Sequence, residues 1–401
     1  MFIRELIVTG LFAALLVVYL LAERFILSRR SRSIPLRICV TGTRGKSSVT
    51  RLIAASLREA GFAALARTTG SKPVIIFPDG EEEEIKRRGS PSILEGKNIL
   101  KKGAELQVQA LVLELMSIHP ERSYFESVEM FKPHILAITN VRLDHLAQMG
   151  TSKEDIARSL SSSIPENGTV FVPQEEFFPV FKEVAERMNA TIIQIPGGSF
   201  TEYLQSKNNL PSFELEENIR LSLAVAEFLG IDKKVALRGM IKARPDFGSL
   251  RTWTADLGSP PRRWLLISCF AANDPESTRL VLSRLLEKMF FNRKEIIGLL
   301  NLRGDRGDRT LQWLKTLKEE AFPEIRKFFF VGDHAHALKS RLKSPGKAEV
   351  FVSKPLGPQK IMEEIAEKVK AEAVLIGMGN IGGLGKELVE YWESIGKPYD
   401  F

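Results

Sequence analysis

The stretch that decides the fold reads Ile38-Cys39-Val40-Thr41-Gly42-Thr43-Arg44-Gly45-Lys46-Ser47-Ser48. An apolar, strand-like run leads into a turn bounded by two glycines, and a Lys-Ser pair then opens a helical pattern. Backbone N–H groups in such a turn can hold phosphate oxygens, and the helix N-terminus and Lys46 add positive charge. The Ser47 hydroxyl is suited to Mg²⁺. We predict a phosphate-binding loop rather than a simple tight turn, made of Gly42, Thr43, Arg44, Gly45, Lys46, Ser47 and Ser48.

The helix expected after this loop has a clear apolar face. Val49, Leu52, Ile53 and Leu57 recur at helical spacing, and Gly61 is a plausible stop. Strand, glycine turn and helix therefore follow in the order that a phosphate loop requires.

Length and composition indicate a globular protein of two domains plus an extra segment. The chain has 401 residues, 44% hydrophobic and 26% charged, with a formal net charge of +8. No nucleic-acid-binding motif accompanies the basic excess, so nucleic acid is the least expected partner. The cysteines, Cys39 and Cys269, each lie in an apolar run, which favours buried thiols in a reducing compartment.

The first residues predict a membrane anchor. Residues 6–22 carry no charge, a length close to the roughly 17–25 residues that a bilayer helix needs. A cleaved signal peptide is the alternative, but the start carries Arg4 beside the acidic Glu5, and the basic residues gather after the apolar run: Arg29, Arg30, Arg32 and Arg37. By the positive-inside rule we expect residues 1–28 to anchor the protein in the cell membrane, with the domains that follow in the cytoplasm.

Two alternating sets of strand-like and helical runs predict an α/β protein. A charged excursion over 78–88 is expected to be a solvated loop or hairpin, and a break near 250–263 to separate the sets. We therefore expect a central domain over 29–255, with the loop and a parallel sheet, and a smaller Rossmann-like domain over 256–401. The expected strands are 36–40, 110–115, 134–139 and 169–172, then 264–268, 296–300, 327–331, 349–352 and 373–377.

Polar residues follow the expected strands of the first set. Glu114 ends one strand, Asn140 ends the next, and Asp144 and His145 come directly after. Ligands in open α/β sheets bind beyond the carboxyl ends of the strands, so these groups should face the phosphate loop. Ser47 and Glu114 offer oxygens suited to Mg²⁺, and His145 is a further candidate ligand. A surface salt bridge is the alternative role for Glu114.

The motifs resemble those of the Mur ligase superfamily, which includes folylpolyglutamate synthases, and most closely those of poly-γ-glutamate synthase catalytic subunits, proteins of capsule biosynthesis. The shortened Gly-x-x-Gly-Lys-Ser loop is typical of this superfamily. The likeness extends in order along essentially the whole chain, through residues 42–48, 68–70, 140–145 with Gly150, 270–274, 303–309 and 377–383.

The resemblance implies a role for each matching position. Lys46 and the loop amides would hold the ATP phosphates, and Ser47, Glu114 and His145 would hold Mg²⁺; Lys46, Glu114 and His145 are thus the expected catalytic residues. Three further residues are expected to contact the nucleotide: Asn218 at the adenine, with Arg251 and Asn273 as the second domain closes. The expected substrate-binding residues are Thr69, Gly70, Arg87, Asn140, Asp305 and Arg306, with Arg67, Lys72 and Arg88 as further basic candidates for an acidic substrate.

Three departures from Mur ligases favour the poly-γ-glutamate subunit. Only the apolar segment and a short basic linker precede the loop, so a nucleotide-sugar peptide has no obvious seat. Residues 155–160 offer no lysine where Mur ligases carry a carbamylated one. Ala272 stands where Mur ligases have a histidine.

The expected activity is therefore an ATP-dependent amide ligase that polymerises glutamate through γ-linkages by way of an acyl phosphate, releasing ADP and phosphate. By the same resemblance, its partners are glutamate, the growing polymer and membrane subunits of the PgsC/CapC and PgsA/CapA types. Two alternatives stay open at this point: another Mur-like ligase such as a folylpolyglutamate synthase, and a non-catalytic ATP-binding subunit of a membrane exporter.

Overall fold

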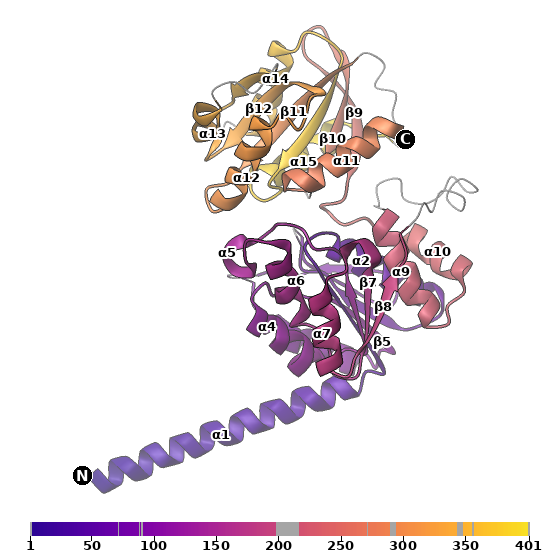
Figure 1. Ribbon diagram of the computed structural model, residues 1–401, viewed down its shortest axis with the longest axis vertical. Helices are drawn as coiled ribbons and strands as arrows, with labels where there is room; N and C mark the ends of the chain where they lie inside the picture. The colour runs from indigo at the N-terminus through magenta and orange to yellow at the C-terminus, as the bar shows by residue number, and fades with distance from the viewer. Residues whose placement is uncertain are drawn as a thin grey trace.

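Two sheets, one after the other along the chain, organise the protein, and a long helix precedes them (Figure 1). The computed structural model describes residues 2–70, 72–87, 89, 91–197, 216–270, 272–288, 294–342, 348–354 and 357–399. The expected α/β class is confirmed, and the sheet in each half is mainly parallel with an antiparallel edge.

The first sheet has eight strands in the order β4-β3-β2-β5-β1-β6-β7-β8, so β1 lies near its centre. β1 pairs in parallel with β5 on one side and β6 on the other, and their carboxyl ends therefore meet at one edge. The strands are β1 (Leu36–Thr41), β2 (Ala64–Arg67), β3 (Val74–Ile76), β4 (Glu82–Glu84), β5 (Ala110–Glu114), β6 (Ile135–Ile138), β7 (Thr169–Pro173) and β8 (Thr191–Ile195).

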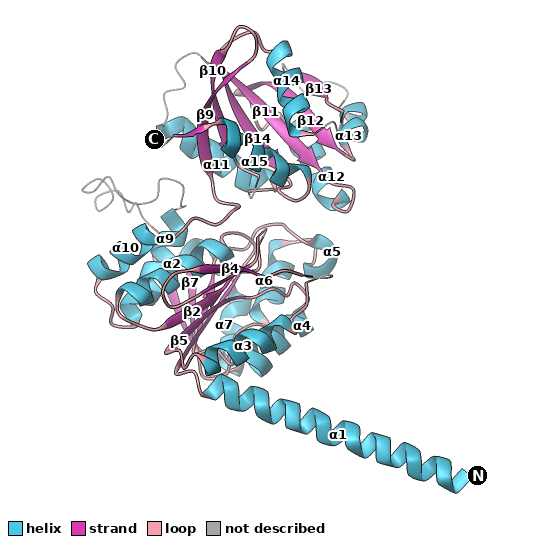
Figure 2. Ribbon diagram, turned by 180° about the vertical axis from the view of Figure 1, so that it is seen from behind, coloured by secondary structure: helices cyan, strands magenta, loops and turns pink. Residues whose placement is uncertain are grey.

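Helices cover both faces of this sheet (Figure 2). Alternate residues of each strand point to opposite faces, so Ile38 and Val40 pack in one apolar cluster and Cys39 in the other. One face carries α2 (Lys46–Glu59), α9 (Glu216–Phe228) and α10 (Lys233–Lys242). The other carries α3 (Glu95–Glu105), the π-helical η1 (Phe125–Phe131), α6 (Lys153–Ser161) and α7 (Pro179–Arg187). Shorter helices, α4 (Pro120–Tyr124), α5 (Leu146–Met149) and η2 (Gln174–Glu176), lie in the connections.

The second sheet has seven strands in the order β13-β12-β11-β14-β10-β9-β15. Its five strands from β13 to β10 are parallel, and β9 and β15 add an antiparallel edge. The strands are β9 (Arg251–Leu257), β10 (Arg262–Ser268), β11 (Glu295–Leu302), β12 (Ile325–Gly332), β13 (Glu349–Val352), β14 (Ala373–Gly379) and β15 (Lys397–Pro398). The helices are α11 (Pro275–Lys288), α12 (Gly307–Lys318), α13 (Ala335–Arg341), α14 (Pro358–Lys368) and α15 (Leu384–Ile395).

The break predicted near 250–263 lies inside the second sheet, and this prediction is wrong. β9 and β10 pair antiparallel from Leu257↔Arg262 to Ser268↔Arg251, so residues 258–261 form a hairpin turn instead of a linker. A boundary between 255 and 256 would cut β9. The connection between the sheets is 243–250, after α10, and we call the parts before and after it the first and second domains.

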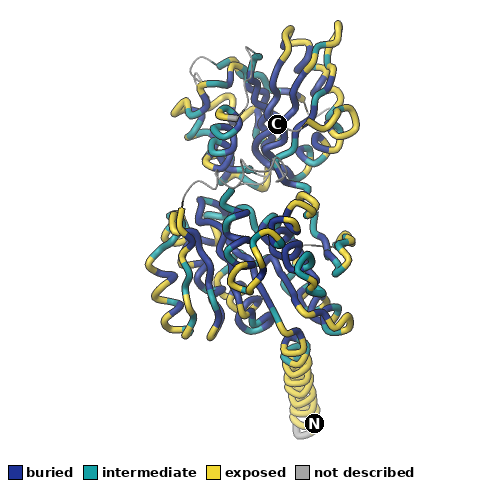
Figure 3. The backbone as a smooth tube through the Cα atoms, turned by 90° about the vertical axis from the view of Figure 1, so that its right-hand side faces the viewer, coloured by how far each residue is buried: buried dark blue, intermediate teal, exposed yellow. Residues whose placement is uncertain are grey.

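Helix α1 (Phe2–Arg32) projects from the first domain on the side away from the second (Figures 1 and 3). Its part from Arg4 to Arg32 is long and apolar enough to cross a membrane, by length and composition only. Its carboxyl end rests on the first domain, where Lys97 of α3 contacts Glu23 and Ser31 donates a 2.9 Å hydrogen bond to the Phe131 carbonyl. The apolar part carries no buried residue, unlike the two domains (Figure 3).

Candidate active site

The phosphate loop joins β1 to α2, as the sequence predicts. Gly42 and Gly45 have φ values of 128° and 76°, in the left-handed region that favours glycine. Space also demands glycine, because a Cβ on Gly42 would lie 2.1 Å from Thr139 Oγ1. A Cβ on Gly45 would lie 2.5 Å from Asn218 Oδ1. Both glycines therefore allow the loop to approach its neighbours closely.

Two residues at the end of β6 hold the loop in shape. The Asn140 Oδ1 accepts hydrogen bonds from Thr43 Oγ1 (2.7 Å) and Arg44 N (2.9 Å). Its Nδ2 donates to the Arg44 carbonyl at 3.2 Å, and Thr139 Oγ1 donates to the same carbonyl at 2.6 Å. The Asn140 side chain, expected to bind substrate, is thus buried against the loop and braces it.

Lys46, at the start of α2, folds back over the loop. Its Nζ donates to the Gly42 carbonyl at 2.8 Å. Burial lowers the pKa of Lys46, while the Glu114 carboxylate acts in the opposite direction. Lys46 lines a cavity together with Ser47, Ser48 and Glu114, so its charge is available to an anion bound there.

Ser47 and Glu114 form the expected oxygen pair. Ser47 Oγ donates to Glu114 Oε2 at 2.8 Å, and the Thr69 N–H donates to the same oxygen at 2.7 Å. A Cβ on Gly70 would lie 2.7 Å from Ser47 Oγ, so the 68–70 segment passes close to the pair. A hydroxyl and a carboxylate at a phosphate loop suit Mg²⁺, which takes few protein oxygens beside phosphate oxygens and water. Among the described residues no three His, Cys, Asp or Glu side chains cluster as an all-protein metal site.

A buried ion pair between Arg67 and Glu126 stabilises the strand end that carries Glu114. Arg67 Nη2 donates to the Glu114 carbonyl at 2.9 Å and to Glu126 Oε1 at 3.0 Å. Glu126 also accepts from the Met116 and Ser117 N–H groups at 3.0 Å. Arg67, proposed from the sequence as a basic contact for substrate, instead holds this strand end in place, because its side chain is only 1% exposed.

His145 begins α5 with a left-handed backbone, φ 50°. Its Nε2 lies 3.4 Å from Asp144 Oδ2. Burial, together with the charges of Arg306, Lys46 and Arg44, lowers the pKa of His145 to about 4, although Asp144 opposes this. The imidazole is therefore neutral near pH 7, the form that can ligate a metal. His145 is not among the described residues that line the cavity.

The cavity has a volume of about 260 Å³ and lies between the domains. The first domain contributes the phosphate loop, Gly70, Glu114 and Asn218. The second contributes polar groups, including Asn273, and apolar side chains, including Val281 and Ile381. The site thus has a cationic end at the phosphate loop and a partly apolar wall.

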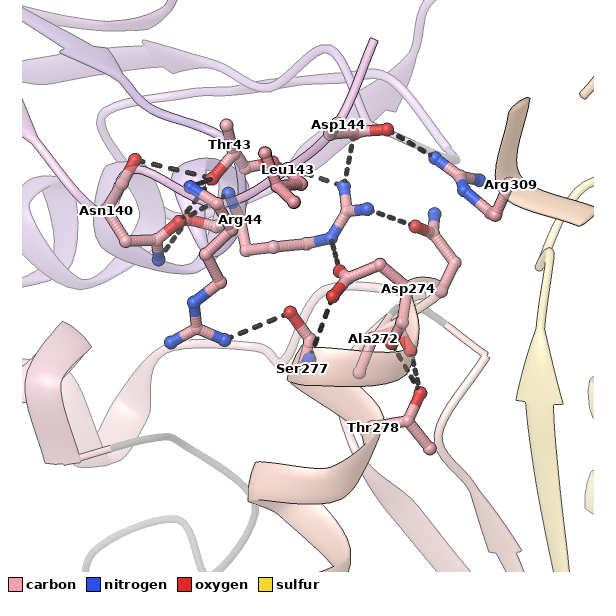
Figure 4. A network of polar contacts seen from close by, with 12 residues as sticks. Thr43, Arg44, Asn140, Leu143, Asp144, Ala272, Asp274, Ser277, Thr278 and Arg309 are labelled. Atoms are coloured by element: carbon pink, nitrogen blue, oxygen red, sulfur yellow. Dashed lines mark hydrogen bonds and ion pairs between the residues drawn. The ribbon is translucent and has the colours of Figure 1, made fainter. Parts of the chain in front are cut away.

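A network of charged groups joins the domains beside this cavity (Figure 4). Arg44 Nε donates to Asp274 Oδ2 at 2.9 Å, Nη1 donates to Asp144 Oδ2 at 2.8 Å, and Nη2 contacts Asn273. Arg309 of α12 reaches the other oxygen of Asp144 at 2.8 Å. Burial alone would raise the pKa of Asp144, but the guanidinium groups, Arg44 first among them, hold it well below its usual range.

Four more charged residues expected in the site make their pairs outside the cavity and outside the interdomain network. Arg251 packs 5.2 Å from the Trp253 ring and pairs with Glu393, outside the described cavity lining. Asp305 is exposed and pairs with Arg303.

The other two are basic candidates for an acidic substrate. Arg87 makes a two-pronged ion pair with Glu95, at the start of α3. Lys72 lies 3.6 Å from Glu84. Arg88 lies outside the described residues.

Sequence reasoning missed two groups at the cavity. Asp246 lies in the connection between the domains, and Arg51 Nε of α2 is 3.7 Å from its Oδ1. Burial raises the pKa of Asp246, which Arg51 opposes. Arg142 crosses to the second domain, donating to Ser277 Oγ at 3.0 Å. The sequence signal for Asp246 was a carboxylate in the Pro-Gly segment 245–248; Arg142 lies within the 140–145 motif, which gave it no role of its own.

Comparison with known families agrees with the fold and with the loop. Residues 40–240 match the model of the Mur ligase middle domain, which places the chain in the class of Mur-ligase-type proteins. Residues 255–395 match the C-terminal domain of poly-γ-glutamate synthase CapB. The chain belongs to the CapB family of the Mur ligase superfamily.

Relatives of similar length support this assignment. The Bacillus anthracis "Capsule biosynthesis protein CapB" is 32% identical, over 98% of this chain and 85% of that protein. The Bacillus subtilis (strain 168) "PGA synthase CapB" is 32% identical, over 94% and 95%. A Yersinia pestis folylpolyglutamate synthase/dihydrofolate synthase, solved with AMPPNP and a Mn ion, shares the fold with a TM-score of 0.67 at 15% identity, covering 93% of this chain and 92% of that one.

Proposed function

We propose that this protein is an ATP-dependent amide ligase that joins glutamate residues through γ-linkages. The observation that carries the proposal is the phosphate loop with Lys46 above it and the Ser47–Glu114 pair beside it, facing a cavity closed by a second domain. Family membership and the name of the B. subtilis relative, a PGA synthase, supply the substrate class.

The chemistry has two steps. First, a carboxylate oxygen of glutamate, or of the growing chain, attacks the γ-phosphorus of ATP; the bond to the bridging oxygen breaks, and ADP leaves. Second, the α-amino group of another glutamate attacks the carbonyl carbon of the acyl phosphate. It loses a proton, the amide forms, and phosphate leaves with the former carboxylate oxygen.

The residues of the chain would bind and align these groups. The loop amides and Lys46 would hold the phosphates and stabilise charge that develops on them. Asn218, in contact distance of the loop at Gly45, would lie beside the nucleoside, with Asn273 facing it from the second domain. Thr69 and Gly70 border the Ser47–Glu114 pair, and in this proposal they would meet the substrate carboxylate.

Ser47 and Glu114 fit Mg²⁺, because both present oxygens at the phosphate loop and the two are 2.8 Å apart. When bound, the ion would neutralise phosphate charge and favour attack at phosphorus. The neutral imidazole of His145 is a further candidate ligand, set beside Asp144.

We further propose that α1 anchors the protein in the cell membrane, with both domains in the cytoplasm, where ATP and glutamate are available. Its apolar part is exposed, and its basic end, with Arg29, Arg30 and Arg32 in the last turn, rests on the first domain. An anchored synthase could pass a polyanionic product to membrane subunits of the PgsC/CapC and PgsA/CapA types.

The proposal is tested with membranes that contain the full chain and these partner subunits, supplied with ATP, Mg²⁺ and labelled glutamate. We expect ADP release that requires glutamate, together with amide-linked labelled polymer, and loss of both in Lys46→Ala. An exporter ATPase would release ADP without glutamate. If hydroxylamine traps glutamyl phosphate and no amide-linked product forms, the protein is a kinase, and the ligase proposal is contradicted.

A folylpolyglutamate synthase is the other candidate considered from the sequence. The match to the CapB C-terminal domain and the two CapB relatives over nearly the full length favour poly-γ-glutamate synthesis over it. The same assay separates them, since a folate enzyme would require a folate acceptor.

A further inference from the structure

One buried carboxylate gathers three guanidinium groups from two domains. Asp144, whose side chain is 4% exposed, follows β6 in the first domain. Arg44 of the phosphate loop reaches its Oδ2 at 2.8 Å. Arg306 and Arg309 of the second domain reach its Oδ1 at 2.9 and 2.8 Å. Two of the three bonds thus cross between domains.

Arg44, in the phosphate loop, also contacts the second domain directly. Arg44 donates to Asp274 at 2.9 Å and also contacts Asn273. Asp274 in turn accepts the Ser277 N–H at 2.8 Å and so caps α11 (Figure 4). Arg44 therefore ties the phosphate loop to the start of one helix of the second domain, and Asp144 ties the loop to the start of another, α12.

Behind Asp144 the chain of contacts continues into the second sheet. Arg309 Nη1 donates to Asn380 Oδ1 at 2.5 Å, and Asn301 Nδ2 donates to the Asn380 carbonyl at 2.6 Å. Arg309, Asn380 and Asn301 are all buried. The connection therefore ends at the carboxyl ends of β11 and β14, neighbouring strands of the second sheet.

The same loop residue also shapes the phosphate site. The Arg44 N–H and carbonyl are both held by Asn140, in the hydrogen bonds that fix the loop. The side chain of Arg44 makes the interdomain contacts, so the backbone of the loop and the position of the second domain are set by one residue.

We propose that Asp144 is a positioning residue that fastens the second domain over the phosphate loop, and that Arg44 links this closure to the conformation of the loop. Removing the charge of Asp144 leaves the guanidinium groups of Arg44, Arg306 and Arg309, whose side chains are 14%, 19% and 4% exposed, close together without their shared carboxylate, which favours opening of the domains. The alignment of reactants by domain closure rests on the proposed function. The closure of the domains does not depend on that function.

The test uses the full chain in detergent with spin labels on two introduced cysteines, Lys182→Cys in α7 and Lys339→Cys in α13. Both sites are exposed, and the native Cys39 and Cys269 are replaced by alanine in every protein compared, because Cys269 lines the cavity that opening of the domains would expose. We expect a short, narrow distribution of distances in the parent protein, and a shift to longer, broader distances in Asp144→Asn.

Turnover provides the second readout. In Asp144→Asn, glutamate-dependent ADP release should fall about 10²-fold, as for a misaligned site, with a larger change in kcat than in the KM for ATP. Asp144→Glu, which restores the charge, should recover part of this loss. The matched control is Glu276→Gln, which removes the exposed interdomain pair with Lys153 and should leave distances and turnover as in the parent.

Parent-like distances in Asp144→Asn, or equal opening in Glu276→Gln, would overturn the proposal. If Asp144→Asn does not fold, Arg306→Gln, at the domain surface, is measured in its place and should open the domains in the same way; parent-like distances there also contradict the proposal. A protein without glutamate-dependent ADP release would refute the proposed function, while the distances would still decide on the closure.

Discussion

A methyl group added to the phosphate loop should weaken nucleotide binding beyond the strain of the backbone itself. Gly45 begins α2 with φ 76°, and a Cβ there would lie 2.5 Å from Asn218 Oδ1. To reach the 3.4 Å of ordinary contact, the loop or the Asn218 side chain must move by about 0.9 Å. The left-handed backbone costs an alanine a further 1–2 kcal/mol, roughly.

The chain offers a matched control in Gly230, after α9. Its φ is 77°, but nothing lies within 4 Å of the Cβ that an alanine would add. Both Gly45→Ala and Gly230→Ala should therefore lose stability in urea denaturation, and Gly45→Ala should lose more because its Cβ also meets Asn218. Calorimetric titration with ADP and Mg²⁺ should show at least about a 10-fold weaker affinity only in Gly45→Ala, equivalent to about 1.4 kcal/mol. Equal affinities in the two variants would refute the assignment of this loop to phosphate.

Four further outcomes involve titratable groups of the first domain or the Mg²⁺ ion. Lys46→Ala should reduce turnover by about 10²–10³-fold, and chelation of Mg²⁺ should abolish it until the ion is restored, both measured as ADP release. Arg67→Leu leaves Glu126 buried without its partner and should lower the free energy of unfolding by about 3–5 kcal/mol, whereas Lys182→Ala, in an exposed pair, should change it by less than about 0.5 kcal/mol. The pKa of His145 is lowered to about 4 in the fold, so the unfolded chain binds the extra proton first as pH falls from 6.5. The free energy of unfolding should therefore decrease between pH 6.5 and about pH 4, and it should decrease by less in His145→Gln than in the parent. Identical dependence on pH in the two proteins would contradict the burial of this imidazole.

Local patterns in the sequence predicted the parts of the site that depend on a few neighbouring residues. The apolar strand, the two glycines and Lys46-Ser47 identify a phosphate loop, because each residue type answers a requirement of that turn. The position of Glu114 followed from a general rule, since parallel neighbouring strands end at the same edge of a sheet.

Ion pairs between residues that are far apart in the sequence could not be predicted from such local patterns. Arg67 and Arg87 are ordinary basic residues in the sequence, and only their contacts with Glu126 and Glu95 distinguish them from groups that bind an anion. Asp144 drew attention beside His145, but its three guanidinium partners are 100 or more residues away. The turn at 258–261 shows a further limit, because glycine and proline mark hairpins and domain linkers alike.

The most direct test of the account follows oxygen from substrate to product. With partner subunits, ATP and glutamate carrying ¹⁸O in its carboxyl groups, mass spectrometry of the released phosphate should find one ¹⁸O atom for each amide bond formed. Phosphate without the label, accompanying amide formation, would contradict an acyl phosphate made at this loop.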